Sequence, residues 1–166
     1  MKPLHYILIG LVLIYLLMGG IFVYFSLSYR KQYKRIRKAT NIIIRDVNEA
    51  LTKIDNELKG QRIELTFVPF EFASDNDDFI EENREKIYGE IDKAREQAGQ
   101  LNAQVKDSKV QELIQNQIAT VEDNLANYRR LVIKHNKIVD NYNFNTRSIF
   151  FYIFAIMINL KKEKHI

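Results

Sequence analysis

The sequence predicts an all-α protein, in which an N-terminal transmembrane helix continues into an antiparallel bundle of three long helices plus a short apolar C-terminal helix. An unbroken run of 24 uncharged, mostly apolar residues, the apolar run (residues 6–29), predicts the membrane helix. Three later segments repeat apolar residues at three- and four-residue steps, the period of packed helices. Beyond the apolar run the chain has only three of its six glycines and one of its two prolines. This scarcity of helix breakers favours long helices over a sheet.

The apolar run is long enough to cross a bilayer. At about 1.5 Å per residue it reaches roughly 36 Å as a helix, and a hydrocarbon core is about 30 Å thick. A cleaved signal peptide would have a shorter apolar region and a small-residue cleavage site. The run ends in Phe-Ser-Leu-Ser-Tyr before the first cation, without such a site. We therefore interpret residues 1–29 as a retained transmembrane anchor and residues 30–166 as a cytoplasmic helical bundle.

The cations around the apolar run predict its orientation. Only Lys2, the terminal amine and the mostly neutral His5 precede it, whereas six cations follow: Arg30, Lys31, Lys34, Arg35, Arg37 and Lys38. Cytoplasmic flanks carry the excess of Lys and Arg, so we expect a single-pass protein of the cell membrane with its N-terminus outside. The same cations could recruit anionic lipid, although such clusters are also the ordinary topology signal. A basic stripe beside lipid is poorly placed to follow a duplex, so we expect no nucleic-acid partner.

Composition and motifs limit the classes of function. The roughly 135 residues beyond the anchor suit one domain. The chain has no cysteine, which excludes disulfides, thiolate catalysis and Cys-ligated metals. The sequence has no phosphate-binding loop, nucleophile elbow or carboxylate pair on one helix face. We therefore expect no enzymatic activity, no catalytic, cofactor-binding or metal-binding residues, and no cofactor.

The first helix is predicted to run without a break out of the membrane. Its apolar stripe beyond the anchor contains Ile36, Ile43, Val47, Ala50, Ile54 and Leu58, with Thr40 filling one position. Neither glycine nor proline interrupts the chain from the anchor to Gly60, where we expect the helix to end.

Residues 61–77 are predicted to be an extended connector. Ile63, Leu65 and Phe67 alternate with polar residues, but one strand without a partner cannot form a sheet, and Pro69 disfavours a helix. We expect the aromatic side chains of the connector to pack on the helices. At about 3.3 Å per residue it could run back along a neighbouring helix. The direction of the next helix is therefore not fixed by the sequence.

Two further helices follow the connector. Asp78 and Glu81 form a capping-box-like start for the second helix, whereas a calcium loop would need a glycine and a ligand spacing that are missing here. The second helix has a seam, interrupted only by Arg84, of Ile80, Ile87, Ile91, Ala94, Ala98, Leu101 and Val105. The third, after Asp107 and Ser108, has the longer seam Ile114, Ile118, Val121, Leu125, Tyr128, Val132, His135, Val139, Tyr142, Thr146 and Ile149. Five heptads of this alternation indicate coiled-coil-like packing.

His135 is the one seam residue that invites a metal or acid–base hypothesis. Its seam neighbours are Val132 and Val139, and neither Glu nor His follows it at three or four residues. The pattern therefore favours a buried, hydrogen-bonded histidine over a ligand. Tyr128 and Tyr142 are likewise expected to be core aromatics.

The C-terminal residues 149–160 are almost wholly apolar and are followed by lysines. As a helix they reach about 18 Å, which is too short to cross a bilayer. They could cap the bundle as a short fourth helix, lie in the lipid interface or dock on a partner, and the sequence favours bundle or membrane packing over a second span.

The chain resembles the LemA family, most of all between residues 135 and 155. The pairs His135-Asn136 and Tyr142-Asn143, seven residues apart, stand where that family has two Tyr-Asn pairs, and they are followed by Ile149-Phe150 and Ala155. The family's Ala-Trp-Ser-x-Ile-Asp-Val-x-Leu-Lys stretch is matched in part by Ala50, Thr52, Ile54, Asp55, Leu58 and Lys59. Residues 90–95 resemble its Ala-Arg element in the second helix.

The chain also departs from the LemA pattern. His135 replaces the first tyrosine of the pairs, Phe150 stands where the family has proline, and Leu51 replaces the tryptophan. The family's Arg-x-Asp-Leu-Ile-Pro turn is present only as residues 62–65, shifted by one position, and the region between the second and third helices is shorter. The resemblance implies a bacterial bundle of long helices on a membrane anchor, with no established enzymatic activity and no catalytic residues.

Three functions remain in competition. The first is a membrane-anchored, non-enzymatic scaffold or interaction module at the cytoplasmic face, either as one chain or as a homo-oligomer. The alternative is a coiled-coil component of an envelope assembly for division, secretion or sensing, which pairs with another membrane protein. The third is a lipid- or metal-dependent enzyme with a site around His135, Tyr142 and the acids of the second helix.

Overall fold

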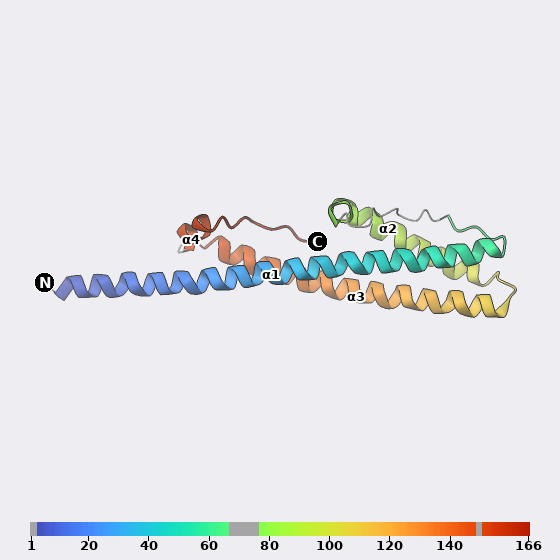
Figure 1. The fold of residues 1–166 in the computed structure, drawn as a ribbon, viewed down its shortest axis with the longest axis horizontal. Helices are drawn as coiled ribbons and strands as arrows, with labels where there is room; N and C mark the ends of the chain where they lie inside the picture. The colour runs from blue at the N-terminus through green and yellow to red at the C-terminus, as the bar shows by residue number, and fades with distance from the viewer. Residues whose placement is uncertain (1–2, 67–76, 149–150) are drawn as a thin grey trace. The chain divides into compact units, whose positions relative to one another are not determined.

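A computed structural model describes residues 3–66, 77–148 and 151–166 of the chain. Its helices, in chain order, are α1 (Pro3–Gly60), α2 (Asp77–Asn102), α3 (Ser108–Thr146) and α4 (Tyr152–Met157) (Figure 1). The described residues contain no strand. The predicted all-α class, with long helices and a short C-terminal helix, is confirmed.

Helix α1 has no break over 58 residues and ends at Gly60, as the sequence predicts. The turn that follows is closed by the amides of Gln61 and Ile63, which donate to the carbonyl of Leu58 at 2.9 and 3.0 Å. Arg62, not Gly60, adopts the left-handed conformation, with φ 60°. The glycine therefore ends the helix, but the change of direction falls two residues later.

The chain forms two compact units, which we describe separately. The first contains residues 1–36 and 134–165, and the second contains residues 37–133 and Ile166. Helices α1 and α3 each contribute to both units.

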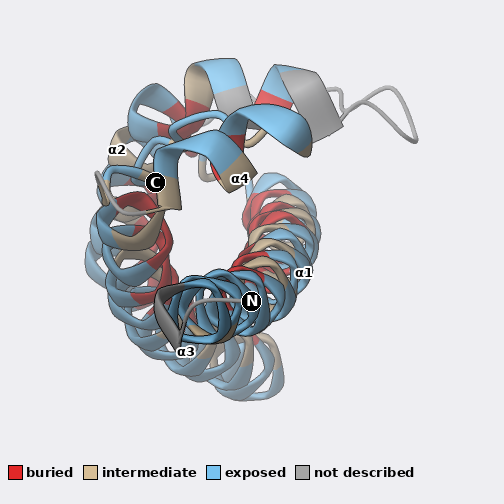
Figure 2. Cartoon of the chain, turned by 90° about the vertical axis from the view of Figure 1, so that its left-hand side faces the viewer, coloured by how far each residue is buried: buried red, intermediate tan, exposed pale blue. Residues whose placement is uncertain are grey.

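The core of the second unit consists of the predicted seams. Buried residues lie on the inward faces of the helices and exposed residues on the outward faces (Figure 2). Nearly all predicted seam positions between residues 43 and 128 are buried there, including Ile43, Val47, Ile54, Leu58, Ile80, Ile87, Ile91, Ala98, Ile114, Val121 and Tyr128. Leu65 is also buried in this core, whereas the connector aromatics between residues 67 and 76 lie outside the described residues.

The helix directions in the second unit follow from two pairs of contacts. Arg95 bonds Glu122 at 3.1 Å and Arg129 bonds the Tyr88 hydroxyl at 2.7 Å, so α2 and α3 are antiparallel as predicted. Early α2 contacts α1 near residue 40, and late α2 contacts Thr66 through Gln97 at 2.8 Å. Helices α1 and α2 therefore run in the same direction (Figure 1), so the antiparallel expectation holds for α3 against its neighbours and not for this pair.

Arg84, which interrupts the α2 seam, is buried against polar residues of α1. Its guanidinium donates to the Thr40 hydroxyl at 3.1 Å and to the Asn41 side-chain oxygen at 2.6 Å. All three side chains are buried, with Arg84 only 7 % exposed. The buried guanidinium thus finds two acceptors on α1, whereas the side-chain nitrogen of Asn41 has no hydrogen-bond partner among the described residues.

Asp107 caps the start of α3. The Asp107 carboxylate accepts hydrogen bonds from the backbone amides of Lys109 and Val110 at 2.9 and 3.4 Å. These amides have no partner within the helix, so the carboxylate stabilises its first turn.

Candidate functional site in the first unit

Helix α1 is long and apolar enough to cross a membrane. An 18-residue window within it has a mean hydropathy of 2.6 and is only 11 % buried. No other helix of the described residues passes the same test of length and composition. Many large apolar side chains of the apolar run are exposed, among them Ile7, Leu8, Leu11, Leu13, Ile14, Leu16, Leu17, Ile21 and Phe25.

The middle of the apolar run is covered on one side by α4. The Phe22 and Phe151 rings are stacked, with centroids 4.9 Å apart and planes inclined by 10°. The Phe154 ring lies 5.3 Å from that of Tyr15. Ala155 is the buried residue of α4 itself. Of the alternatives open for residues 149–160, the structure thus shows packing on α1, with residues 149 and 150 outside the described residues.

Gly19 makes the approach of α4 possible. A Cβ atom on Gly19 would overlap the Phe154 ring, whereas a Cβ on the adjacent Gly20 would meet nothing within 4 Å. The two glycines are neighbours in sequence, but only Gly19 faces the aromatic contact.

Replacing Gly19 with leucine is expected to displace Phe154 and separate α4 from α1, because the new side chain occupies the space of the ring. The measurement is cross-linking of a Phe22→Cys/Phe151→Cys variant with a short bis-maleimide, in a chain that otherwise has no cysteine. Gly19→Leu should reduce the yield several-fold and Gly20→Leu should leave it unchanged. Equal yields from the two variants would show that the contact does not depend on Gly19.

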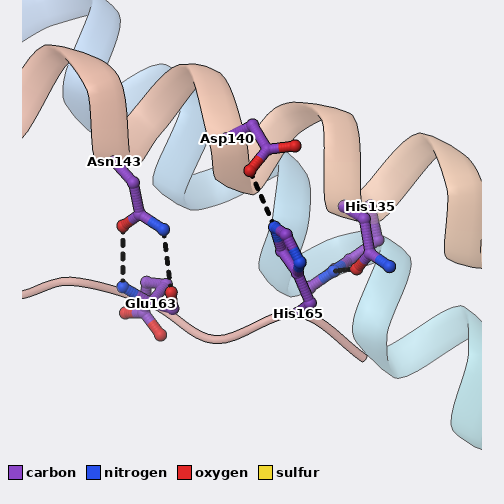
Figure 3. A network of polar contacts seen from close by, with 6 residues as sticks. His135, Asp140, Asn143, Glu163 and His165 are labelled. Carbon is purple, nitrogen blue, oxygen red and sulfur yellow. Dashed lines mark hydrogen bonds and ion pairs between the residues drawn. The ribbon is translucent and has the colours of Figure 1, made fainter.

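A polar cluster holds the chain after α4 against α1 and α3, and Figure 3 shows its contacts with α3. The Asn143 side chain donates to the backbone carbonyl of Glu163 at 2.9 Å and accepts from its amide at 3.0 Å. The Tyr33 hydroxyl donates to the Glu163 carboxylate. One glutamate is therefore bound through both its backbone and its side chain, by residues of two helices.

The aromatic residues beside this cluster are buried. Tyr33 packs edge-on against His135 and Tyr142, with centroids 5.8 and 5.6 Å away. Burial, and next the hydrogen bond to Glu163, raise the pKa of the Tyr33 hydroxyl far above its ordinary range. Burial likewise raises the pKa of the Tyr142 hydroxyl. Both hydroxyls are therefore protonated at neutral pH, and Tyr33 remains a donor to Glu163.

An open cavity of about 560 Å³ lies beside the polar cluster. At its edge His165 contacts Asp140 at 2.8 Å, the second link between the C-terminal residues and α3. The lining carries both charge signs and comprises Asp140, Asn143, Phe144, Arg147, Ser148, Lys162, Glu163, Lys164 and His165.

The enzyme hypothesis names residues of both units, of which His135 and Tyr142 belong to the first. His135 is 1 % exposed and contacts the Asn136 side chain at 3.2 Å, the buried and hydrogen-bonded state that the seam predicts. Tyr142 is buried beside it, and both lie in the first unit, whereas α2 belongs to the second. Within the described ranges, no three His, Cys, Asp or Glu side chains lie together as metal ligands would.

Four of the six cations that follow the apolar run are exposed on α1, namely Lys31, Lys34, Arg35 and Lys38. Arg30 and Arg37 are half-buried. The sequence did not single out Tyr33, Asn143 and Glu163 as a cluster. Its signals in the sequence were Asn143, half of the LemA-like pair Tyr142-Asn143, and Glu163, the one acid among the C-terminal lysines.

Comparison of the chain with protein-family models, with curated proteins and with solved structures finds no match. The LemA resemblance therefore rests on the sequence positions quoted above.

Proposed function

We propose that the chain is a LemA-like, membrane-anchored and non-enzymatic helical protein that acts as a scaffold or interaction module at the cytoplasmic face of the cell membrane. In this proposal the apolar run spans the bilayer with the N-terminus outside, and the exposed cations of α1 lie at the cytoplasmic headgroups. A soluble protein would cover a helix of this hydropathy with its own chain.

The observation that carries the proposal is the exposure of α1. Only 11 % of its most apolar window is buried. The buried core helix of a soluble protein would pass the same hydropathy test while being mostly covered, and α1 is not. The exposed cations that follow the window support the cytoplasmic orientation of this end.

The heptad seams favour the scaffold over the coiled-coil alternative. An envelope coiled coil would present a seam to a second chain, but the seam residues of α2 and α3 are largely buried within this chain. The interaction surface of the proposed scaffold is then its outer faces, where apolar side chains such as Ile42, Leu113 and Ile133 are exposed singly.

The burial of His135 supports a non-enzymatic role. Its ring is packed against Tyr33 inside the first unit and leaves almost no surface for a substrate. An acid–base group has to reach the proton that it transfers.

Proximity labelling in living cells tests both location and role. A labelling enzyme fused after Ile166 should modify cytoplasmic proteins and enrich a defined set of neighbours over the same enzyme expressed alone. Labelling confined to proteins outside the cell would overturn the orientation. Labelling indistinguishable from that of the free enzyme would overturn the scaffold role.

A further inference from the structure

We propose that α4 is a re-entrant membrane segment, which packs on α1 inside the bilayer and turns its exposed face to the lipid acyl chains. The inference rests on the proposed anchoring of α1 and identifies a second part of the chain that lipid would contact. In this inference the exposed face of α4 is covered by lipid hydrocarbon and not by a protein.

The position of α4 along α1 determines how deep α4 lies in the bilayer. Phe154 lies over Gly19, in the middle of the apolar run, and Phe151 lies over Phe22. At about 1.5 Å per residue, Gly19 is roughly 16 Å along α1 from Arg30, or half of a hydrocarbon core of about 30 Å. If the apolar run spans the bilayer, its contact with Phe154 falls near the bilayer centre.

The face of α4 that points away from α1 has the chemistry of a lipid contact. Its side chains Tyr152, Ile153, Ile156 and Met157 are 60 %, 61 %, 60 % and 75 % exposed. Residues 149–160 carry no charge. This face continues the exposed apolar surface of α1, so the same hydrocarbon that covers one covers the other.

The ends of the segment return to the polar level of α1. The chain leaves α3 after Thr146 and is bound again at Glu163, which contacts Tyr33 and Asn143. Tyr33 follows the apolar run by four residues. Lys161, Lys162 and Lys164 flank the return and can reach headgroups. A segment that enters and leaves at one level, and is too short to span, is re-entrant.

The backbone after α4 meets the hydrogen-bonding demand of a bilayer. Non-helical backbone in hydrocarbon is costly unless its amides have partners. The amides of Ile158, Asn159 and Leu160 donate to carbonyls of Phe154, Ile156 and Ala155 at 3.3, 3.0 and 2.9 Å. Asn159, with φ 51°, reverses the chain direction while these bonds are kept.

The absence of tryptophan from the chain allows a direct test of depth. Single tryptophans are placed in the full chain at Ile156 in α4, at Leu17 in the apolar run and at Ile133 in the second unit. Ile156 and Ile133 are a matched pair, since both are isoleucines with 60 % and 71 % exposure. Each variant is reconstituted in phosphatidylcholine vesicles with bromine atoms either deep in the acyl chains or near the ester groups.

Ile156→Trp and Leu17→Trp should each lose at least half of their emission in the deeply brominated vesicles, and Ile133→Trp should lose almost none. Stronger quenching of Ile156→Trp by the shallow bromines would mean that α4 lies flat at the interface, which overturns the re-entrant segment. No quenching at Ile156 with full quenching at Leu17 would overturn this inference and leave the anchor intact. No quenching at Leu17 would overturn the anchor itself.

A cysteine pair tests the depth of α4 independently, without the bulk of tryptophan. Ile153→Cys and Ile133→Cys are labelled with a membrane-impermeant maleimide in the same vesicles, because smaller side chains disturb α4 less. The expected result is at least tenfold slower labelling of Ile153→Cys. Equal labelling rates would overturn the proposal.

Discussion

Replacing Arg84 with alanine is expected to lower the stability of the second unit by about 3 kcal/mol, because loss of the guanidinium leaves buried polar groups without a hydrogen-bond donor. Arg84 donates to Thr40 and Asn41, and both of these side chains are fully buried. The substitution also removes an aliphatic stem that fills the seam. Hydrogen exchange of α2 amides in the full chain should accelerate about 100-fold, the factor that corresponds to this free energy.

Two comparisons separate this effect from the loss of any arginine. Arg130 is exposed on α3. Arg130→Ala should change the free energy of opening that α2 hydrogen exchange reports by less than about 0.5 kcal/mol. The triple variant Thr40→Val/Asn41→Leu/Arg84→Met removes donor and acceptors together and should recover most of the lost stability. If Arg84→Ala exchanged no faster than Arg130→Ala, the buried polar contact would not contribute to stability.

Replacing Asn143 with alanine is expected to release the C-terminal residues from α3. The variant loses both hydrogen bonds to the backbone of Glu163, at about 1 kcal/mol each. Trypsin cleavage after Lys161, Lys162 and Lys164 should then rise about 30-fold, because cleavage follows the population of the open form. The rate of appearance of the shortened chain, followed by mass spectrometry, measures the change.

Asn127 provides the matched control for Asn143. It is an exposed asparagine on the same helix, and Asn127→Ala should leave the cleavage rate unchanged. Tyr33→Phe removes only the hydroxyl that donates to Glu163 and should give a smaller rise than Asn143→Ala. A cleavage rate in Asn143→Ala equal to that in Asn127→Ala would mean that other contacts hold the C-terminal residues.

The helices and their buried faces could be predicted because each is encoded locally. The seam through Ile114, Val121, Tyr128, His135 and Tyr142 is buried at every one of these positions. The unbroken α1 and its end at Gly60 follow from the distribution of glycine and proline. These features depend on neighbours a few residues apart, which a periodic pattern specifies.

The contacts between distant segments could not be predicted in the same way. The direction of α2 depends on the course of its connector, and the placement of α4 depends on a strip that is apolar on all sides and so indicates no face. The sequence indicates that Arg84 and Thr40 each interrupt the apolar seam of their helix, but it does not indicate that they contact each other. The Glu163 cluster depends on residues far apart in sequence, for which no short-range pattern exists.

The Tyr33–Glu163 contact also has a consequence for biosynthesis, because its partners are 130 residues apart in the chain. At roughly 10 residues per second, Tyr33 is made about 13 s before Glu163. If the apolar run spans the bilayer as proposed, it is inserted while the surface around Gly19 still faces bulk lipid or the insertion machinery, and α4 can close over it only after α4 has itself been made. Residues made long after α1 therefore complete its packing, so a product that stops before α4 would leave the surface around Gly19 uncovered.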